Sequence, residues 1–327
     1  MDEQQRFARR ERRRREVRRR RIVALASLSA LAFLAVVVIV IVDVGGAGSE
    51  PSGGAAADSA RQLAKAGSDG AGKHRAGASS RPHVRTGPPG TAPVPILIYH
   101  VIAAPPAGAP FPGLYVEPAE FAEQMQALKD AGWHAVTMDE VGAYWSRGVP
   151  LGPGKPVVVS FDNGYNSQYT QALPVLRRLG WVGDLNIQLT GLPPSQGGLG
   201  EGQVRGLLAA GWELDTQGIS HAALITLDAE ALHDQVSVAR ETLRRRYHVP
   251  VNWFCYPSGQ YDATVEAAVR AAGFVGSTTV VPGWAHPSDD PYRLHRLRVL
   301  GGTSGQQLLE LLASTREDPP APSSYTA

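Results

Sequence analysis

The sequence contains a single cysteine, Cys255, among its 327 residues. One cysteine excludes an intrachain disulfide, and it also excludes a metal site built on several thiolates. Cys255 stands between Phe254 and Tyr256, and free cysteine is among the most buried residue types. It is therefore predicted to be a small buried residue on a strand.

The chain also lacks a strong net charge, since its formal charge is only +2. Residues 1–21 hold eleven arginines and four acids, a net charge of +7, so the remaining residues together carry −5. The arginine run could bind nucleic acid or anionic lipid. Its position beside an apolar segment favours a role in membrane topology and lipid contact, and no nucleic-acid partner is predicted.

Charged residues are absent from residues 22–42, a stretch of 21 residues rich in Val, Leu, Ala and Ile. At 1.5 Å per residue such a helix spans a bilayer core of about 30 Å. Its length favours an uncleaved anchor over a cleaved signal peptide. Because arginine-rich flanks stay in the cytoplasm, we expect a single-pass protein of the cell membrane, with its N-terminus inside and the residues after Asp43 outside.

Beyond the apolar segment, residues 43–92 consist mainly of Gly, Ala, Ser and Pro and cannot bury a core, so they are predicted to form a disordered linker. A folded domain is expected over residues 93–316, and a disordered tail over residues 317–327. Within the domain, apolar strand patterns alternate with helical ones, which indicates a parallel sheet. The expected strands are 94–99, 135–138, 157–161, 184–189, 212–215, 252–256, 274–278 and 294–300. The number of units favours a distorted α/β barrel with seven or eight (β/α) repeats over an open sheet.

Polar residues follow several of these strands, where barrel enzymes carry their chemistry. His100 follows ILIY, Asp162 and Asn163 follow VVVSF, and the segments ELDTQGISH, FCYPSGQYD and RLHRLRV stand at later strand ends.

Five segments together resemble the polysaccharide deacetylases of the NodB homology type, carbohydrate esterase family 4. They are PILIYHVI, EPAEFAEQMQALKDAGWHAVTMDEV, SFDNGY, ELDTQGISHAAL and YPSGQYD, in the order in which the family has them. The resemblance covers roughly residues 93–315. It implies a NodB-type barrel that removes acetyl groups from a cell-envelope polysaccharide or from peptidoglycan, and no protein partner is predicted.

The family's chemistry is hydrolysis assisted by a divalent ion, commonly zinc, which one Asp and two His hold. By resemblance, Asp162 is the general base, His100 is the general acid and His221 is a metal ligand. Asn163 takes the place of the metal-binding Asp, and Gln217 takes the place of the first metal-binding His. An arginine that often precedes the third motif is missing, and Phe254 stands near its position.

The two changed ligands offer only neutral amide oxygens, so a metal is expected to bind more weakly than in the family. Asp215 could supply a relocated carboxylate, because residues 213, 215 and 217 point the same way on a strand. Four residues are predicted to contact the sugar: Tyr165, Tyr256, Pro257 and Trp212.

Alternatives to an active deacetylase remain open at this point. The domain could be a carbohydrate-binding module without a catalytic metal, since exposed aromatics can stack on sugar rings, although large aromatics usually bury area instead. It could be a scaffold that has lost its site. It could also be a glycosidase in which Asp162 and Glu213 or Asp215 form a pair of carboxylates.

Overall fold

The computed structural model of the chain describes residues 87–190, 192, 197–316 and 321–326. The expected arginine-rich segment, the expected membrane helix and the linker up to residue 86 lie outside these ranges. Among the residues that are described, no helix is both long and apolar enough to cross a membrane.

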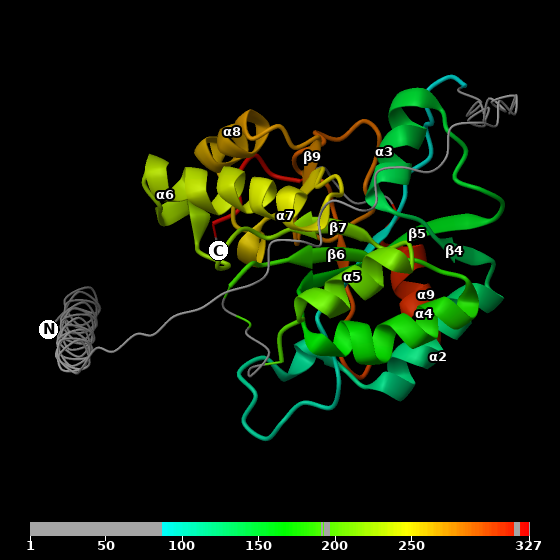
Figure 1. Cartoon of the computed structure of the whole chain (residues 1–327). Coiled ribbons are helices and arrows are strands. Elements are labelled where there is room, and N and C mark those ends of the chain that lie inside the picture. The colour runs from blue at the N-terminus through cyan, green and yellow to red at the C-terminus, as the bar shows by residue number, and fades with distance from the viewer. Residues whose placement is uncertain (1–86, 191, 193–196, 317–320, 327) are drawn as a thin grey trace, which may run out of the picture. The chain divides into compact units, whose positions relative to one another are not determined.

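Eight parallel strands form the centre of the domain (Figure 1). They are β1 Ile96–Tyr99, β4 Trp133–Ala135, β5 Lys155–Asn163, β6 Asp184–Ile187, β7 Glu213–Thr216, β8 Trp253–Cys255, β9 Gly276–Thr278 and β10 Leu297–Arg298. Their order is β10-β1-β5-β6-β7-β8-β9, with β4 paired to the start of β5. A small second sheet pairs β2 (Val101–Ile102) with β3 (Tyr115–Val116). Each of the eight strands expected from the sequence has a counterpart in the main sheet.

The barrel is closed by a short run of backbone hydrogen bonds between residues 277–281 and residues 294–296. The two ends of the sheet, β9 and β10, share no ladder, but Thr278 at the end of β9 forms a parallel bridge with Leu294, three residues before β10 begins. Since β10 pairs with β1, this bridge links the last strand back to the first. The distorted parallel barrel predicted from the sequence is therefore present, as a curved sheet whose strands β9 and β10 are joined only loosely.

Helices cover the outside of the sheet (Figure 1). They are α2 Pro118–Asp130, α3 Met138–Arg147, α4 Leu173–Leu179, α5 Glu201–Ala209, α6 Ala229–His233, α7 Ala239–Tyr247, α8 Ala263–Ala271 and α9 Gly305–Ser314. One face of α2 is apolar, and its residues Phe121, Met125 and Leu128 are fully buried. The strand residues they face are also buried, so the main core lies between the sheet and this helical layer.

Both ends of the described chain pack on the domain, which corrects two predicted boundaries. Backbone N–H groups of Gly87 and Gly90 donate to carbonyl oxygens of α3, and the Trp145 indole donates to Ala92 O, so residues 87–92 are not free linker. In the predicted tail, Tyr325 forms an antiparallel bridge with Tyr261.

Candidate active site

An open cavity of about 760 Å³ lies at the carboxyl ends of the strands. It is lined by residues that follow β1, β5, β6, β7 and β8, and by Tyr325 from the C-terminal segment. His100, Asp162, Asn163, Gln217 and His221, which the sequence placed in one site, all line this cavity. The fold thus brings together residues that are far apart in the sequence, since His100 and His221 are separated by 121 positions.

Asp162 is the best-anchored residue of the site. It lies at the end of β5 and is only 2% exposed. Arg296 holds both carboxylate oxygens, with Nη1 to Oδ1 at 2.8 Å and Nη2 to Oδ2 at 2.9 Å, and Asn186 Nδ2 also donates to Oδ1 at 3.0 Å. Burial raises the pKa of Asp162, but the charge and hydrogen bonds of Arg296 outweigh it and lower the pKa to about 2. Asp162 is therefore a permanently charged, firmly held carboxylate.

Arg296 is a functional residue that the sequence did not single out. It lies just before β10 in the segment RLHRLRV, and it is fully buried. The chain lacks the arginine that the family often has before its third motif, and the structure supplies a guanidinium to the base position from another strand. Little in the sequence signals this role, because Arg296 is one of three arginines in this strand-like segment.

The two cavity histidines are uncharged at neutral pH. Burial is the largest cause that lowers the pKa of His100, which falls to about 4, and Arg296 and Arg298 lower it further while Asp162 opposes them. Nδ1 of His100 is buried and has no hydrogen-bond partner among the described residues. Burial also lowers the pKa of His221. Both rings therefore present a nitrogen lone pair rather than a second proton.

Asn163 and Gln217 bind each other and their neighbours. The backbone N–H of Asn163 donates to Gln217 Oε1 at 3.0 Å, and Asn163 Nδ2 donates to Gln188 Oε1 at 3.0 Å. Gln217 Nε2 donates to Cys255 Sγ at 3.0 Å. Asn163 adopts a left-handed backbone with φ of 71°, which Asn tolerates better than most residues. The next position requires glycine, since φ of Gly164 is 90° and an added Cβ would lie 2.8 Å from Ile187 Cγ1.

These residues do not fit the family's metal ion. The trio of Asn163, Gln217 and His221 carries no negative charge, and its amides are engaged in hydrogen bonds within the protein. Zinc and similar ions bind carboxylate, imidazole or thiolate far better than a neutral amide. In the part of the chain that is described, His100, Asp162 and His221 also do not form a group of ligand atoms close enough to hold one ion. We therefore derive no catalytic step through a metal at this position.

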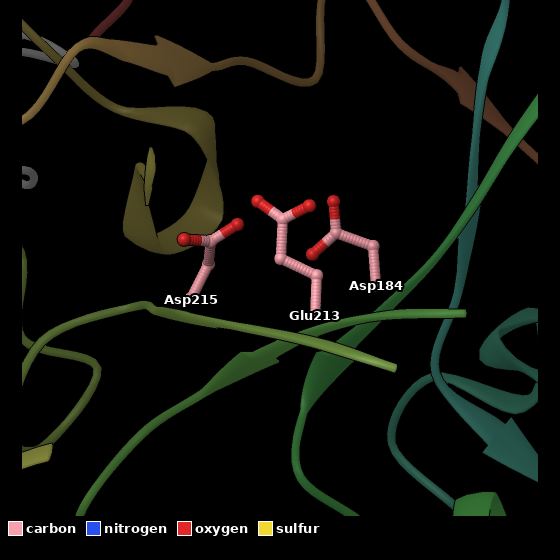
Figure 2. A group of neighbouring side chains, drawn as sticks. All are labelled: Asp184, Glu213 and Asp215. Atoms are coloured by element: carbon pink, nitrogen blue, oxygen red, sulfur yellow. The ribbon is translucent and has the colours of Figure 1, made fainter. Parts of the chain in front are cut away.

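Asp215 does not reach the cavity. Its Oδ1 accepts from the backbone N–H groups of Asn252 and Trp253, at 3.1 and 2.8 Å, and its carboxylate lies with those of Asp184 and Glu213 (Figure 2). The parity argument holds, because Glu213 and Asp215 do share a face of β7. However, the backbone around the start of β8 holds Asp215, whereas Gln217 lies beyond the end of β7 and binds Asn163 and Cys255. The suggested carboxylate beside Gln217 is thus absent.

The predicted sugar contacts divide into two groups. Tyr165 is half-buried and lines the cavity, and Tyr256 also borders it, although its hydroxyl donates to Tyr292 O at 3.0 Å. Trp212 is a correction: it is 3% exposed and stacks on Phe161 with ring centroids 4.9 Å apart, so it belongs to the core. Pro257 is buried in a short turn and is not among the residues that line the cavity.

The fold and these motifs agree with the known proteins that the chain resembles. The sequence model described as "Polysaccharide deacetylase" matches residues 151–277, which include the strand ends with Asp162, Gln217 and His221. The folded domain is thus similar to the polysaccharide deacetylases. The chain is 27% identical over 214 residues to "Putative polysaccharide deacetylase YxkH" of Bacillus subtilis (strain 168), an alignment that covers 65% of the chain and 74% of the relative.

Two further proteins extend the comparison. Over 59 residues, 18% of its length and 9% of the relative, the chain is 37% identical to the poly-beta-1,6-N-acetyl-D-glucosamine N-deacetylase of Escherichia coli (strain K12). Among solved structures, the Streptococcus pyogenes deacetylase PplD in complex with acetate has the same fold. Its TM-score is 0.63 at 24% identity, over 70% of this chain and 100% of that one.

Proposed function

We propose that this protein is anchored in the cell membrane by residues 22–42 and hydrolyses acetyl groups on an extracytoplasmic, cell-envelope glycan. The observation that carries the proposal is the pair of Asp162 and His100, which remains in an open cavity of about 760 Å³ on the family's fold. An N-acetylated polymer is the favoured substrate class, since one relative's name specifies poly-beta-1,6-N-acetyl-D-glucosamine. A cavity of this size holds a few sugar units.

The charges in the site favour a division of roles that differs from the one implied by resemblance. Asp162, with a pKa of about 2 and both oxygens held by Arg296, is a weak base. His100 is neutral above a pKa of about 4 and is therefore ready to accept a proton. We assign proton transfer to His100, and to Asp162 the stabilisation of the imidazolium that forms, because its charge raises the pKa of His100.

The reaction then balances with water as the only co-substrate. The water oxygen bonds to the acetyl carbonyl carbon, and the water proton passes to His100. The C–N bond breaks, the nitrogen takes the proton from His100, and acetic acid leaves, with a free amine on the sugar; the acid then ionises to acetate in solution. Arg298 lines the same cavity and acts electrostatically on His100, so its guanidinium is available to stabilise negative charge on the carbonyl oxygen.

Replacement of His100 by alanine is expected to lower the rate of acetate release by roughly 10²–10⁴-fold, the usual contribution of a general base or acid. The measurement is enzymatic detection of acetate from poly-N-acetylglucosamine, with the full chain in detergent. His233→Ala is the matched control, since His233 is exposed at the end of α6 and is expected to leave the rate unchanged.

The pH profile of kcat/KM separates the two divisions of roles. If His100 accepts a proton first, the rate rises with pH through about 4 and then stays level, because the neutral ring is the active form. If a protonated His100 were required in the free enzyme, the rate would fall above that pH. If the wild-type protein binds the glycan but releases no acetate at any pH, the proposed function is contradicted. The domain would then be a carbohydrate-binding module.

A further inference from the structure

A second group of acids lies inside the sheet, away from the cavity. Asp184 and Glu213 are the first residues of the paired strands β6 and β7, and Asp215 is two residues further along β7. One ligand oxygen from each lies within 4.8 Å of the others. Figure 2 shows the three carboxylates side by side on these neighbouring strands. Asp184 and Glu213 lie at the amino-terminal ends of their strands, whereas Asp215 is level with Asp162, since both residues pair with Asn186.

Each carboxylate has an oxygen without a partner. Asp184 Oδ1, Glu213 Oε1 and Asp215 Oδ2 are buried, and none has a hydrogen-bond donor among the described residues. The other oxygens are fixed in two cases: the backbone N–H of Asp139 donates to Glu213 Oε2 at 2.9 Å, and those of Asn252 and Trp253 donate to Asp215 Oδ1. The backbone thus orients these carboxylates while the free oxygens face the interior of the group.

Arg296 is a nearby cation, and its charge lowers the pKa of Asp184, although its ion pair is with Asp162. None of the three acids forms a salt bridge with a described lysine or arginine. Asp139 adds a fourth carboxylate nearby, although its own oxygens accept from Asn252 Nδ2 and Trp253 Nε1. Burial first, and the neighbouring acids second, raise the pKa of Asp215 and Glu213, so three bare charges cannot coexist here.

We propose that Asp184, Glu213 and Asp215 bind a hard divalent cation of the Ca²⁺ type that ties β6 to β7. Ca²⁺ takes oxygen ligands at about 2.3–2.6 Å. One oxygen from each of the three acids lies close enough to the other two to reach the same ion. An all-carboxylate set selects a hard ion over zinc, and the backbone N–H groups that orient Glu213 and Asp215 supply the outer support that metal ligands need.

The group is close to solvent on one side. Asp139 and Asn252, whose N–H groups contact Glu213 and Asp215, both line a surface pocket of about 610 Å³. Asp139 and Asn252 separate the carboxylates from this pocket, which gives a cation a route other than the cavity that holds His100. The proposal does not depend on the proposed function, because none of the three acids lines that cavity.

The test is calorimetric titration of the full chain in detergent, after removal of metal with a chelator, using Ca²⁺, Mg²⁺ and Mn²⁺ alone. We expect saturable binding of Ca²⁺ with a stoichiometry of one and a rise in Tm with Ca²⁺ concentration. D184N/D215N should weaken the affinity at least 100-fold and remove the Tm response. Glu117→Gln is the matched control, since Glu117 is an exposed acid whose side chain makes no capping hydrogen bond.

Two further measurements test the proposal even if the double variant does not fold. Bound Tb³⁺ in wild type should show luminescence sensitised by the adjacent Trp253, and Ca²⁺ should displace it. His221→Ala should retain the Ca²⁺ affinity, because His221 lines the other cavity. Absence of saturable binding of all three cations by wild type, or loss of binding in His221→Ala alone, would overturn the assignment.

Discussion

Replacement of Arg296 by methionine is expected to lower the free energy of unfolding by about 3–5 kcal/mol, because removal of one partner leaves a buried charge unpaired. Asp162 is 2% exposed and receives two of its three side-chain N–H hydrogen bonds from Arg296. Arg296 Nε also donates to Thr279 O at 2.8 Å, so the residue that follows β9 loses a hydrogen bond as well.

Denaturant unfolding followed by tryptophan fluorescence measures this effect, since all six tryptophans lie between residues 133 and 284 of the folded domain. The double variant R296M/D162N is the control, because it removes the unpaired charge and should recover much of the loss. A loss below about 1 kcal/mol in Arg296→Met would contradict the role given to the ion pair, since that is the size of an exposed salt bridge.

The dependence of stability on pH in acid should also change in Arg296→Met. The folded-state pKa of Asp162 is about 2, below its ordinary value of 3.8, so its contribution to stability is present above pH 3.8 and is lost as the pH falls toward 2. In Arg296→Met the carboxyl keeps its burial without its partner, and its folded-state pKa should then exceed the ordinary value. Stability of the variant should accordingly increase as the pH falls from above that raised pKa to about 3.8, and it should then stay level at lower pH.

The double variant N163D/Q217H should bind zinc roughly a thousandfold more tightly than the native chain. It restores an Asp-His-His set with His221, and it replaces two neutral amides by an anionic carboxylate and an imidazole, the ligands that zinc prefers. Loss of an outer partner of a metal ligand alone typically costs about 10–100-fold in affinity, so two restored ligands should count for more. Positions 163 and 217 are already in contact, with Asn163 N and Gln217 Oε1 3.0 Å apart.

Zinc titration by calorimetry, with acetate release measured in parallel, tests this expectation. N163A/Q217A is the matched control, because it removes the same side-chain hydrogen bonds without adding a ligand. Equal zinc affinity in the native chain and in N163D/Q217H would show that the surrounding structure, and not the two amides, prevents metal binding.

Much of this architecture could be predicted from the sequence, for identifiable reasons. The eight strands of the main sheet were predicted because buried parallel strands read as continuous apolar runs. The burial of Cys255 followed from its apolar neighbours and is confirmed at 0% exposure. The helices α3 and α9 were not predicted, although both begin at capping boxes, Thr137 with Glu140 and Ser304 with Gln307, whose spacing is visible in the sequence.

The rest of the site depends on contacts between distant segments. Arg296 is buried only because Asp162 lies beside it, and the two residues are 134 positions apart. Trp212 was predicted to face a sugar because an aromatic near a strand end can lie on either side of the sheet, and its stacking on Phe161 places it in the core. Asp215 and Gln217 were expected to lie together because alternate residues of a strand share a face. They do not, because Asp215 is held by the backbone of the neighbouring strand while Gln217 lies beyond the end of its own strand.

The state of Cys255 has a practical consequence for locating the domain in the cell. Its Sγ receives hydrogen bonds from Gln217 and Arg296, and burial raises its pKa to about 12, so the thiol stays protonated and unreactive. The native chain is thus expected not to react with maleimides. A cysteine introduced at an exposed position then becomes the only labelled site. With a membrane-impermeant maleimide on intact cells, Glu117→Cys should be labelled and Ala8→Cys should not, which reads the orientation of the anchor directly.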